Sequence, residues 1–218
     1  MIVDFRRYTL KPGQLGPYTN LYGSQGYPVQ VKHLGPAHGW FVSDVGPQNH
    51  VVHLWAYDSL AQMEDRRAVM AADPDWIPVR DAFKGMFAEQ ETRIMTMVPN
   101  LPYTRSAQKP GLADIRIYTV HHGEMSAFLS FMRDEAAVVQ ARHWPDNIAY
   151  LTSHIGTLNQ VVHIWGHADH TERLARRQQL LADPDWQGCL KTILPRVARM
   201  ETFTAVPAAF WQRDPTQE

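Results

Sequence analysis

The sequence predicts an α+β fold in which one ferredoxin-like unit, with the order strand, helix, strand, strand, helix, strand, occurs twice in a fused chain. The first observation is an internal repeat, because a shift of 110 residues superimposes the two halves without a gap. The segments that match are 4–9 with 114–119, 51–55 with 161–165, and 72–76 with 182–186. The second observation is a polar, proline-rich stretch without periodicity between the halves. We therefore place the first repeat at 1–99, a linker at 100–110, the second repeat at 111–207 and a tail at 208–218.

The first half of each repeat is predicted from alternation and from the placement of glycine and proline. Residues 2–10 alternate between apolar and polar side chains, which is the period of a strand. Residues 14–33 follow as a helix that glycines and a proline are expected to interrupt, whereas the equivalent helix at 125–141 is more regular. The β-rich runs 40–45 and 50–57 are separated by a Gly-Pro-Gln-Asn turn and form a hairpin.

The second half of each repeat is predicted from helix-capping residues. An aspartate and a serine at 58–59 are candidate N-caps for a helix over 60–70. An Asp-Pro pair begins a second helix over 73–87, because proline is favoured at the first helical position. A strand over 91–98 then closes the unit.

The order of the elements predicts which side chains become neighbours. Right-handed crossovers place the first and third strands side by side in the middle of the sheet. Asp4, Arg6 and Tyr8 then lie beside His53 and Trp55. Since helices cover only one face of each sheet, we expect the two sheets to cover each other. The enclosed space, lined by polar and aromatic sets from both repeats, is the predicted small-molecule site.

Composition excludes some partners. With 21 basic and 22 acidic residues, the chain has no long-range field that would favour nucleic acid or an anionic membrane. No basic and apolar leader precedes the first strand, and no apolar run is long enough to cross a membrane, so we expect a cytoplasmic protein. No pair of histidines has the spacing of a zinc site, and no metal is predicted. Outer helix faces make a homodimer a further expectation.

Three motifs carry a family resemblance. Residues 4–8 read Asp-x-Arg-x-Tyr, residues 46–55 read Gly-Pro-Gln-Asn-His-Val-Val-His-Leu-Trp, and residues 73–76 read Asp-Pro-Asp-Trp. Together they resemble the NIPSNAP family, here in tandem-duplicated form. The resemblance implies the dimeric α/β-barrel superfamily, whose members include haem-binding proteins, cofactor-free monooxygenases and lyases. The sequence departs from the family at Asp4 and Asp114, where glutamate is usual, and the second repeat lacks the turn proline. The two repeats therefore need not both be active.

Two sets of polar side chains are candidates for catalysis. They are Asp4, Arg6, Tyr8 and His53 in the first repeat, and Asp114, Arg116, Tyr118 and His163 in the second. The arginines suit an anionic substrate oxygen, or they pair with the aspartates and hold the sheets together. The histidines are either proton acceptors near neutral pH or satisfied core residues. The tyrosines either donate to an oxyanion or cap the end of the barrel.

Aromatic side chains and arginine pairs complete the candidate residues. The aromatic candidates for substrate contact are Trp40, Trp55, Tyr150 and Trp165, although aromatic residues at strand periods usually belong to the core. The Arg-Arg pairs at 66–67 and 176–177 are predicted to be solvated faces of outer helices.

Three functional hypotheses follow. The first is a cofactor-independent enzyme of lyase or isomerase type, acting on a small aromatic or apolar substrate with an anionic oxygen, with a cofactor-free monooxygenase as an alternative. The second is a haem- or small-ligand-binding module without turnover, since one axial histidine suffices for haem. The candidate axial ligands are His33, His53, His143, His154 and His163. The third is an interaction protein whose barrel is a sealed core.

Overall fold

The computed structural model describes residues 1–144 and 146–214. The first repeat contains β1 (Ile2–Leu10), α1 (Leu15–Leu21), the π-helical segment η1 (Tyr22–Gly26), α2 (Tyr27–Leu34), β2 (Gly39–Ser43), β3 (His50–Tyr57), α3 (Leu60–Ala71), α4 (Trp76–Ala82) and β4 (Phe87–Met97). The second contains β5 (Leu112–Val120), α5 (Met125–Phe131), the π-helical segment η2 (Met132–Ala136), α6 (Ala137–His143), β6 (Asn147–Ile155), β7 (Gln160–His167), α7 (His170–Ala182), α8 (Pro184–Ile193), the 3₁₀ turn η3 (Leu194–Arg196) and β8 (Val197–Pro207). The predicted pair of fused ferredoxin-like units is confirmed.

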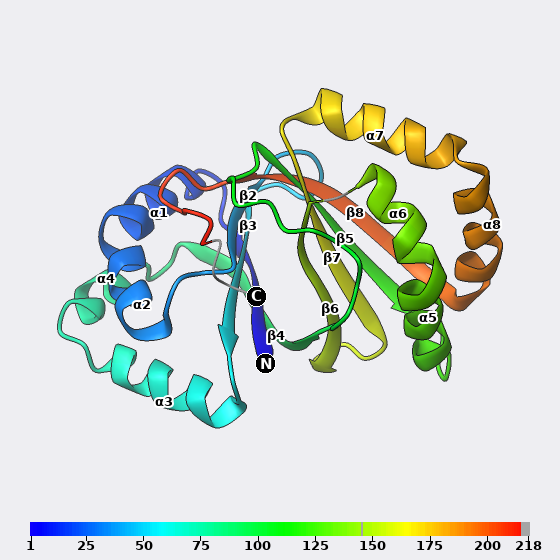
Figure 1. Cartoon of the computed structure of the whole chain (residues 1–218). Coiled ribbons are helices and arrows are strands. Elements are labelled where there is room, and N and C mark those ends of the chain that lie inside the picture. Colours follow the sequence, from blue (N-terminus) through cyan, green and yellow to red (C-terminus); the bar gives the residue numbers. More distant parts are fainter. Residues whose placement is uncertain (145, 215–218) are drawn as a thin grey trace.

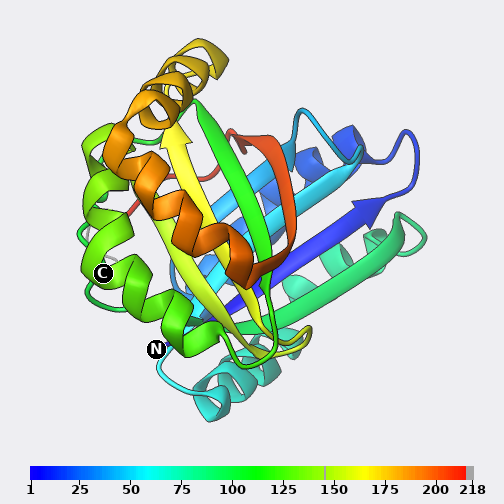
Figure 2. The same ribbon diagram turned by 90° about the vertical axis from the view of Figure 1, so that its right-hand side faces the viewer.

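The strands close into one antiparallel barrel in the order β1-β3-β2-β8-β5-β7-β6-β4. Within each repeat the first strand lies between the third and the fourth, as the crossover rule predicts. Two seams join the repeats, β2 with β8 and β4 with β6. Helices α1–α4 lie on one side of the barrel and α5–α8 on the other (Figure 1). Seen from the side of the second repeat, its green and orange helices cross in front of the strands (Figure 2).

The helix after the first strand is continuous in both repeats. The glycines and the proline that were expected to interrupt it lie in η1 and at the start of α2, where the helix widens to π geometry without breaking. The equivalent helix of the second repeat was expected to be more regular, yet it contains η2 at the same offset. Both expectations were therefore wrong about how the helix is built.

The helix predicted over 73–87 is shorter in the first repeat. Helix α4 ends at Ala82, and β4 already begins at Phe87 after Gly85, whose φ of 82° ends the turn. The aspartate of the Asp-Pro pair accepts the same hydrogen bond in both repeats, from the Asp75 amide to Asp73 and from the Asp185 amide to Asp183, and in the second repeat the helix begins directly after it.

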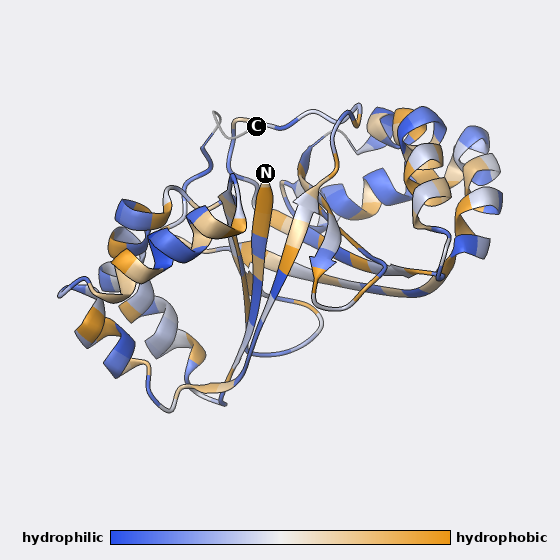
Figure 3. Ribbon diagram, turned by 90° about the horizontal axis from the view of Figure 1, so that it is seen from below, coloured by the Kyte–Doolittle hydropathy of each residue, from blue (hydrophilic) through white to orange (hydrophobic). Residues whose placement is uncertain are grey.

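Most of the barrel interior is apolar, apart from a buried hydrogen bond of Arg93 to Gln160, and this corrects the predicted position of the site. One buried cluster includes Val3, Phe5, Leu54, Ile115 and Ile164, and these alternate along their strands with the polar candidates. Figure 3 shows this alternation as stripes of opposite hydropathy along the strands. The polar and aromatic sets therefore lie between sheet and helices, in two separate places. Alternation assigns side chains to two faces, but it does not say which face the helices cover.

The tail packs back onto the first repeat. Trp211 is buried against Phe41, and its indole N–H donates to the Ala37 carbonyl at 2.9 Å. Arg213 donates through both terminal nitrogens to the Asp146 carboxylate, each at 2.8 Å. The tail is therefore bound to the rest of the molecule through Trp211 and Arg213, and the last part of the predicted tail, 215–218, lies outside the described residues. In the part of the chain that the structure describes, no helix has the length and apolar character needed to span a bilayer.

Candidate functional site

Each repeat has a cavity between its sheet and its helices. The first cavity measures 470 Å³, and Arg6, Tyr8 and His53 form part of its sheet wall. The second measures 250 Å³ and is bordered by Arg116 and Tyr118 at the equivalent sheet positions. Most of the predicted catalytic side chains therefore gather as expected within each repeat, but the two sets do not face each other.

A carboxylate network positions Arg6 in the first cavity. Asp4 is fully buried and accepts hydrogen bonds from Arg6 Nε at 2.9 Å, from Arg67 Nη2 at 2.5 Å and from the Thr92 hydroxyl. One carboxylate thus faces two guanidinium groups, so the cluster keeps a net positive charge. Arg6 Nη1 donates to the Tyr8 hydroxyl oxygen at 2.6 Å. Burial opposes the charge of Arg6, yet Tyr8 and Asp4 hold its pKa above the usual value.

The two candidate histidines each accept a hydrogen bond at Nδ1, which argues against the proton-acceptor role considered for them. The Trp55 indole N–H donates to His53 Nδ1 at 2.8 Å, and Trp165 donates to His163 Nδ1 at 2.9 Å. An imidazole that accepts at Nδ1 carries its proton on Nε2 when it is neutral. Neither Nε2 atom has a hydrogen-bond partner among the described residues. Each Nε2–H is therefore left without an acceptor among the described residues, and neither histidine can take a proton there as a base.

Burial keeps both imidazoles neutral. It lowers the pKa of His53 well below 6.5, and the charges of Arg6 and Arg67 add to this effect. Burial together with Arg116 lowers the pKa of His163 to about 3. Both side chains stay neutral donors across the physiological range.

Aromatic residues from the helices, which the sequence did not single out, make the wall opposite the sheet. The first cavity is lined by Tyr18, Tyr22, Trp76 and Phe83. Tyr22 comes from η1, and its hydroxyl donates to the Gln30 side-chain carbonyl. The π-helical segment therefore supplies a wall residue of the cavity, a place where such segments often occur.

The predicted substrate-contact residues lie in different places. Trp40 and Trp55 are fully buried and line neither of the two cavities, and Trp40 stacks on the His53 ring at 5.8 Å between centroids. Tyr150 lines the second cavity. Trp165 lines a third cavity, beside the linker.

The second cavity is smaller because an additional aromatic residue fills it. Trp144 lies under the guanidinium of Arg116, 4.3 Å from the ring centroid, where the first repeat has Leu34. Asp114 accepts from Arg116 at 3.0 Å and from Arg173 at 2.8 Å. Arg173 takes the place of Met63 of the first repeat.

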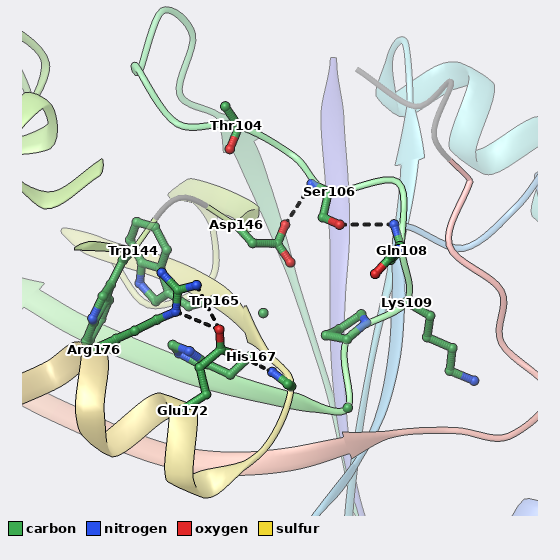
Figure 4. Close-up of a pocket in the computed structure, with 14 residues that line it drawn as sticks. Thr104, Ser106, Gln108, Lys109, Trp144, Asp146, Trp165, His167, Glu172 and Arg176 are labelled. Atoms are coloured by element: carbon green, nitrogen blue, oxygen red, sulfur yellow. Dashed lines mark hydrogen bonds and ion pairs between the residues drawn. The ribbon is translucent and has the colours of Figure 1, made fainter. Parts of the chain in front are cut away.

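The linker cavity is the third and measures 560 Å³. Figure 4 shows linker residues facing the end of β7 and the start of α7 across it. Its carboxylates are already engaged, Asp146 by Arg213 and Glu172 by Arg176. The wall contains His167, whose nitrogens have no hydrogen-bond partner among the described residues. The segment predicted as a plain connector thus contributes a wall of this cavity.

The two Arg-Arg pairs are not solvated faces, which corrects that expectation. Arg66 donates to the Leu34 carbonyl, Arg67 to Asp4 and Arg176 to the His143 carbonyl. The sequence contained a signal that Arg67 faces inward. Met63, Arg67 and Met70 are spaced by four and three residues and therefore share one helical face.

Two of the candidate axial histidines do not suit a haem iron. A metal-bound histidine ligates through one nitrogen and donates its other N–H, whereas His53 and His163 accept at that other nitrogen. His33 and His143 bind Asp73 and Asp183 at 2.6 and 2.8 Å, a pairing that is compatible with ligation through the other ring nitrogen, and His154 is exposed. Within 1–144 and 146–214, no group of three or more metal-ligating side chains is placed to hold a metal.

Known proteins match over both repeats. The NIPSNAP family model matches residues 3–102 and again residues 113–212. The chain belongs to the NIPSNAP family. This NIPSNAP chain is 22% identical to human NipSnap homolog 3A over 217 residues, which cover 95% of this chain and 83% of that one.

Solved structures share the barrel at low identity. A protein described as a candidate monooxygenase from Lactobacillus acidophilus superimposes with a TM-score of 0.65 at 10% identity, over 97% of this NIPSNAP chain and 96% of that one. An anthrone oxidase-like protein superimposes with a TM-score of 0.64 at 11% identity, over 94% and 90%. At these identities the likeness supports the fold of the NIPSNAP chain alone.

Proposed function

We propose that the first cavity is the active site of a cofactor-independent monooxygenase acting on a planar aromatic substrate with one anionic oxygen. One observation carries the proposal: Arg6, Tyr8 and His53 line a single aromatic cavity, and the Asp4 carboxylate behind its wall binds two guanidinium groups, so a net positive charge remains beside the cavity. Such an arrangement stabilises a phenolate or enolate oxygen in the substrate.

The first cavity is lined by the hydrogen-bond donors Arg6, Tyr8 and His53, and this favours oxidation of the substrate over lyase or isomerase reactions. Those reactions need a group that accepts a proton at neutral pH. On the described wall, the acceptor nitrogen of His53 is already engaged by Trp55, and Asp4 is committed to two arginines. A substrate that enters as its enolate has already lost that proton in solution, and the bound anion can reduce dioxygen itself. The C–H carbon of the enolate, flanked by two rings, then becomes a ketone; one oxygen atom enters the product, and the second leaves as hydroxide with the remaining hydrogen.

Anthrone tests the proposal, because its enolate undergoes this oxidation to anthraquinone. The name of the anthrone oxidase-like neighbour supports this choice of substrate. We expect the protein to accelerate oxygen consumption over the spontaneous rate, and Arg6→Gln to lower kcat/KM by about 100-fold. Asp4 keeps Arg67 and Thr92 in this variant, so the fold is expected to survive.

Two further variants sharpen the experiment. Arg199→Gln removes the same charge from an exposed side chain paired with Glu201 and serves as the matched control. Arg116→Gln reports whether the second cavity contributes to turnover. Equal rates for wild type and Arg6→Gln contradict the proposal. Binding of anthrone without acceleration identifies a ligand-binding module instead.

A further inference from the structure

The second cavity contains more positive charge than its carboxylate balances. Asp114 already accepts hydrogen bonds from both Arg116 and Arg173. Arg177 lines the same cavity and has neither a hydrogen bond nor an ion pair with any described residue. In the first repeat the equivalent of Arg177 is Arg67, which binds the aspartate directly. In the second repeat Arg173 binds the aspartate instead, and Arg177 has no partner among the described residues.

This excess charge is unfavourable in the empty cavity. Arg116 is only 8% exposed, and Asp114 is fully buried. Burial lowers the pKa of Arg177, and the neighbouring charges of Arg116 and Arg173 lower it further. A bound anion would remove this penalty, since it supplies the missing negative charge.

The cavity mouth is apolar, in contrast to that of the first repeat. Leu190, Leu194 and Met200 line it. The equivalent positions in the first cavity are Arg80, Lys84 and Gln90. Leu194 and Met200 are 50% and 46% exposed. Apolar side chains that gather at a cavity mouth and face water indicate an apolar ligand segment there.

We propose that the second cavity binds a medium-chain carboxylate, with the carboxylate between Arg116 and Arg177 and the alkyl chain leaving past Leu190 and Leu194. The volume of 250 Å³ has room for about eight groups of roughly water size, which corresponds to octanoate. This site and its ligand are independent of the oxidation proposed for the first cavity.

Titration calorimetry with sodium octanoate tests the assignment. We expect saturable binding that weakens about fourfold for each methylene removed, as apolar burial predicts. Arg177→Gln should weaken octanoate by about tenfold or more while leaving 1-octanol unaffected. The same variant should melt at a higher temperature without ligand, because it removes an unpaired charge.

A mouth variant and a charge-matched control complete the test. Leu194→Asp, at an exposed position, should weaken octanoate through repulsion and loss of apolar contact. Arg199→Gln should bind like wild type, since Arg199 is exposed and paired with Glu201. The proposal is overturned if octanoate does not bind, if Arg177→Gln binds it with full affinity, or if the empty Arg177→Gln variant melts lower than wild type.

Discussion

At His53 and His163, a tryptophan two residues along the strand decides which nitrogen carries the proton. Residues at this spacing share a face, so the indole N–H reaches Nδ1 in both repeats. The His-x-Trp pattern was visible in the sequence, and the donor role was predictable from it. The unpaired Arg177 was not predictable, because it depends on which of two arginines on one helix face reaches Asp114.

The pKa of His163 predicts a pH dependence of stability. Its folded pKa of about 3 lies below the unfolded value of 6.5, so the unfolded chain binds the proton first as the pH falls. Stability is therefore complete above about pH 6.5 and is lost progressively down to about pH 3. His163→Asn keeps an acceptor for Trp165 but removes this titration. Between pH 7.5 and 5, wild type should lose about 2 kcal/mol more unfolding free energy than the variant.

Urea unfolding at the two pH values measures this difference. His154→Asn is the control, because His154 is exposed and should leave the pH dependence of wild type unchanged. An equal loss of stability in wild type and His163→Asn would show that His163 does not resist protonation.

Among the elements, the π-helical segments show where local sequence stops being informative. Tyr22–Gly26 contains two glycines, which suggested an interruption, whereas Met132–Ala136 contains neither glycine nor proline. The same geometry at the same offset must therefore come from packing against the sheet and the neighbouring helices. Strand positions, by contrast, were predictable, because alternation and turn residues are local signals.

The helix around Gly23 yields a prediction about a close contact with the tail. A Cβ at Gly23 would lie 2.4 Å from Cδ1 of Phe210. Gly23→Ala alone should therefore destabilise the protein by about 1 kcal/mol through crowding. In a Phe210→Ala background the sign should reverse, since alanine is the better helix former by about 1 kcal/mol.

Chemical denaturation of the four proteins in this cycle measures the coupling. Gly16→Ala is the matched control in the same helix, because nothing lies within 4 Å of its added Cβ. It should have the same effect in both backgrounds. A stabilising Gly23→Ala in wild type would mean that Phe210 moves aside without cost.

At the level of the whole molecule, the repeat predicted two units, and the family resemblance implied their closure into a barrel. The sequence indicated the bounds of the linker and the tail but could not predict where they pack, because both lack periodicity. The residues just after the last strand of each repeat nevertheless bind equivalently, with the Val98 amide donating to the Tyr150 carbonyl and the Ala208 amide to the Trp40 carbonyl. The chain after the first repeat thus contacts the second repeat, and the chain after the second repeat contacts the first.

The Arg213 contact with Asp146 binds the tail to the second repeat as well. Its side chain is almost fully buried. Arg213→Met should destabilise the protein by about 3 kcal/mol, because it leaves the Asp146 carboxylate without its bidentate partner. Arg142→Gln breaks an exposed pair with Asp185 and should have no measurable effect. Equal denaturation midpoints for Arg213→Met and Arg142→Gln would contradict a structural role for the tail.

Covalent fusion of the two units frees each cavity to change alone. A barrel assembled from two identical chains must accept every substitution twice, at both symmetry-related positions. Here methionine stands at 63 and arginine at 173, which makes the charges of the two cavities differ, and Lys84 and Leu194 make their mouths differ. One scaffold can thus specialise its halves for two different compounds, as two subunits of a heterodimer do, while one open reading frame keeps them in equal amounts.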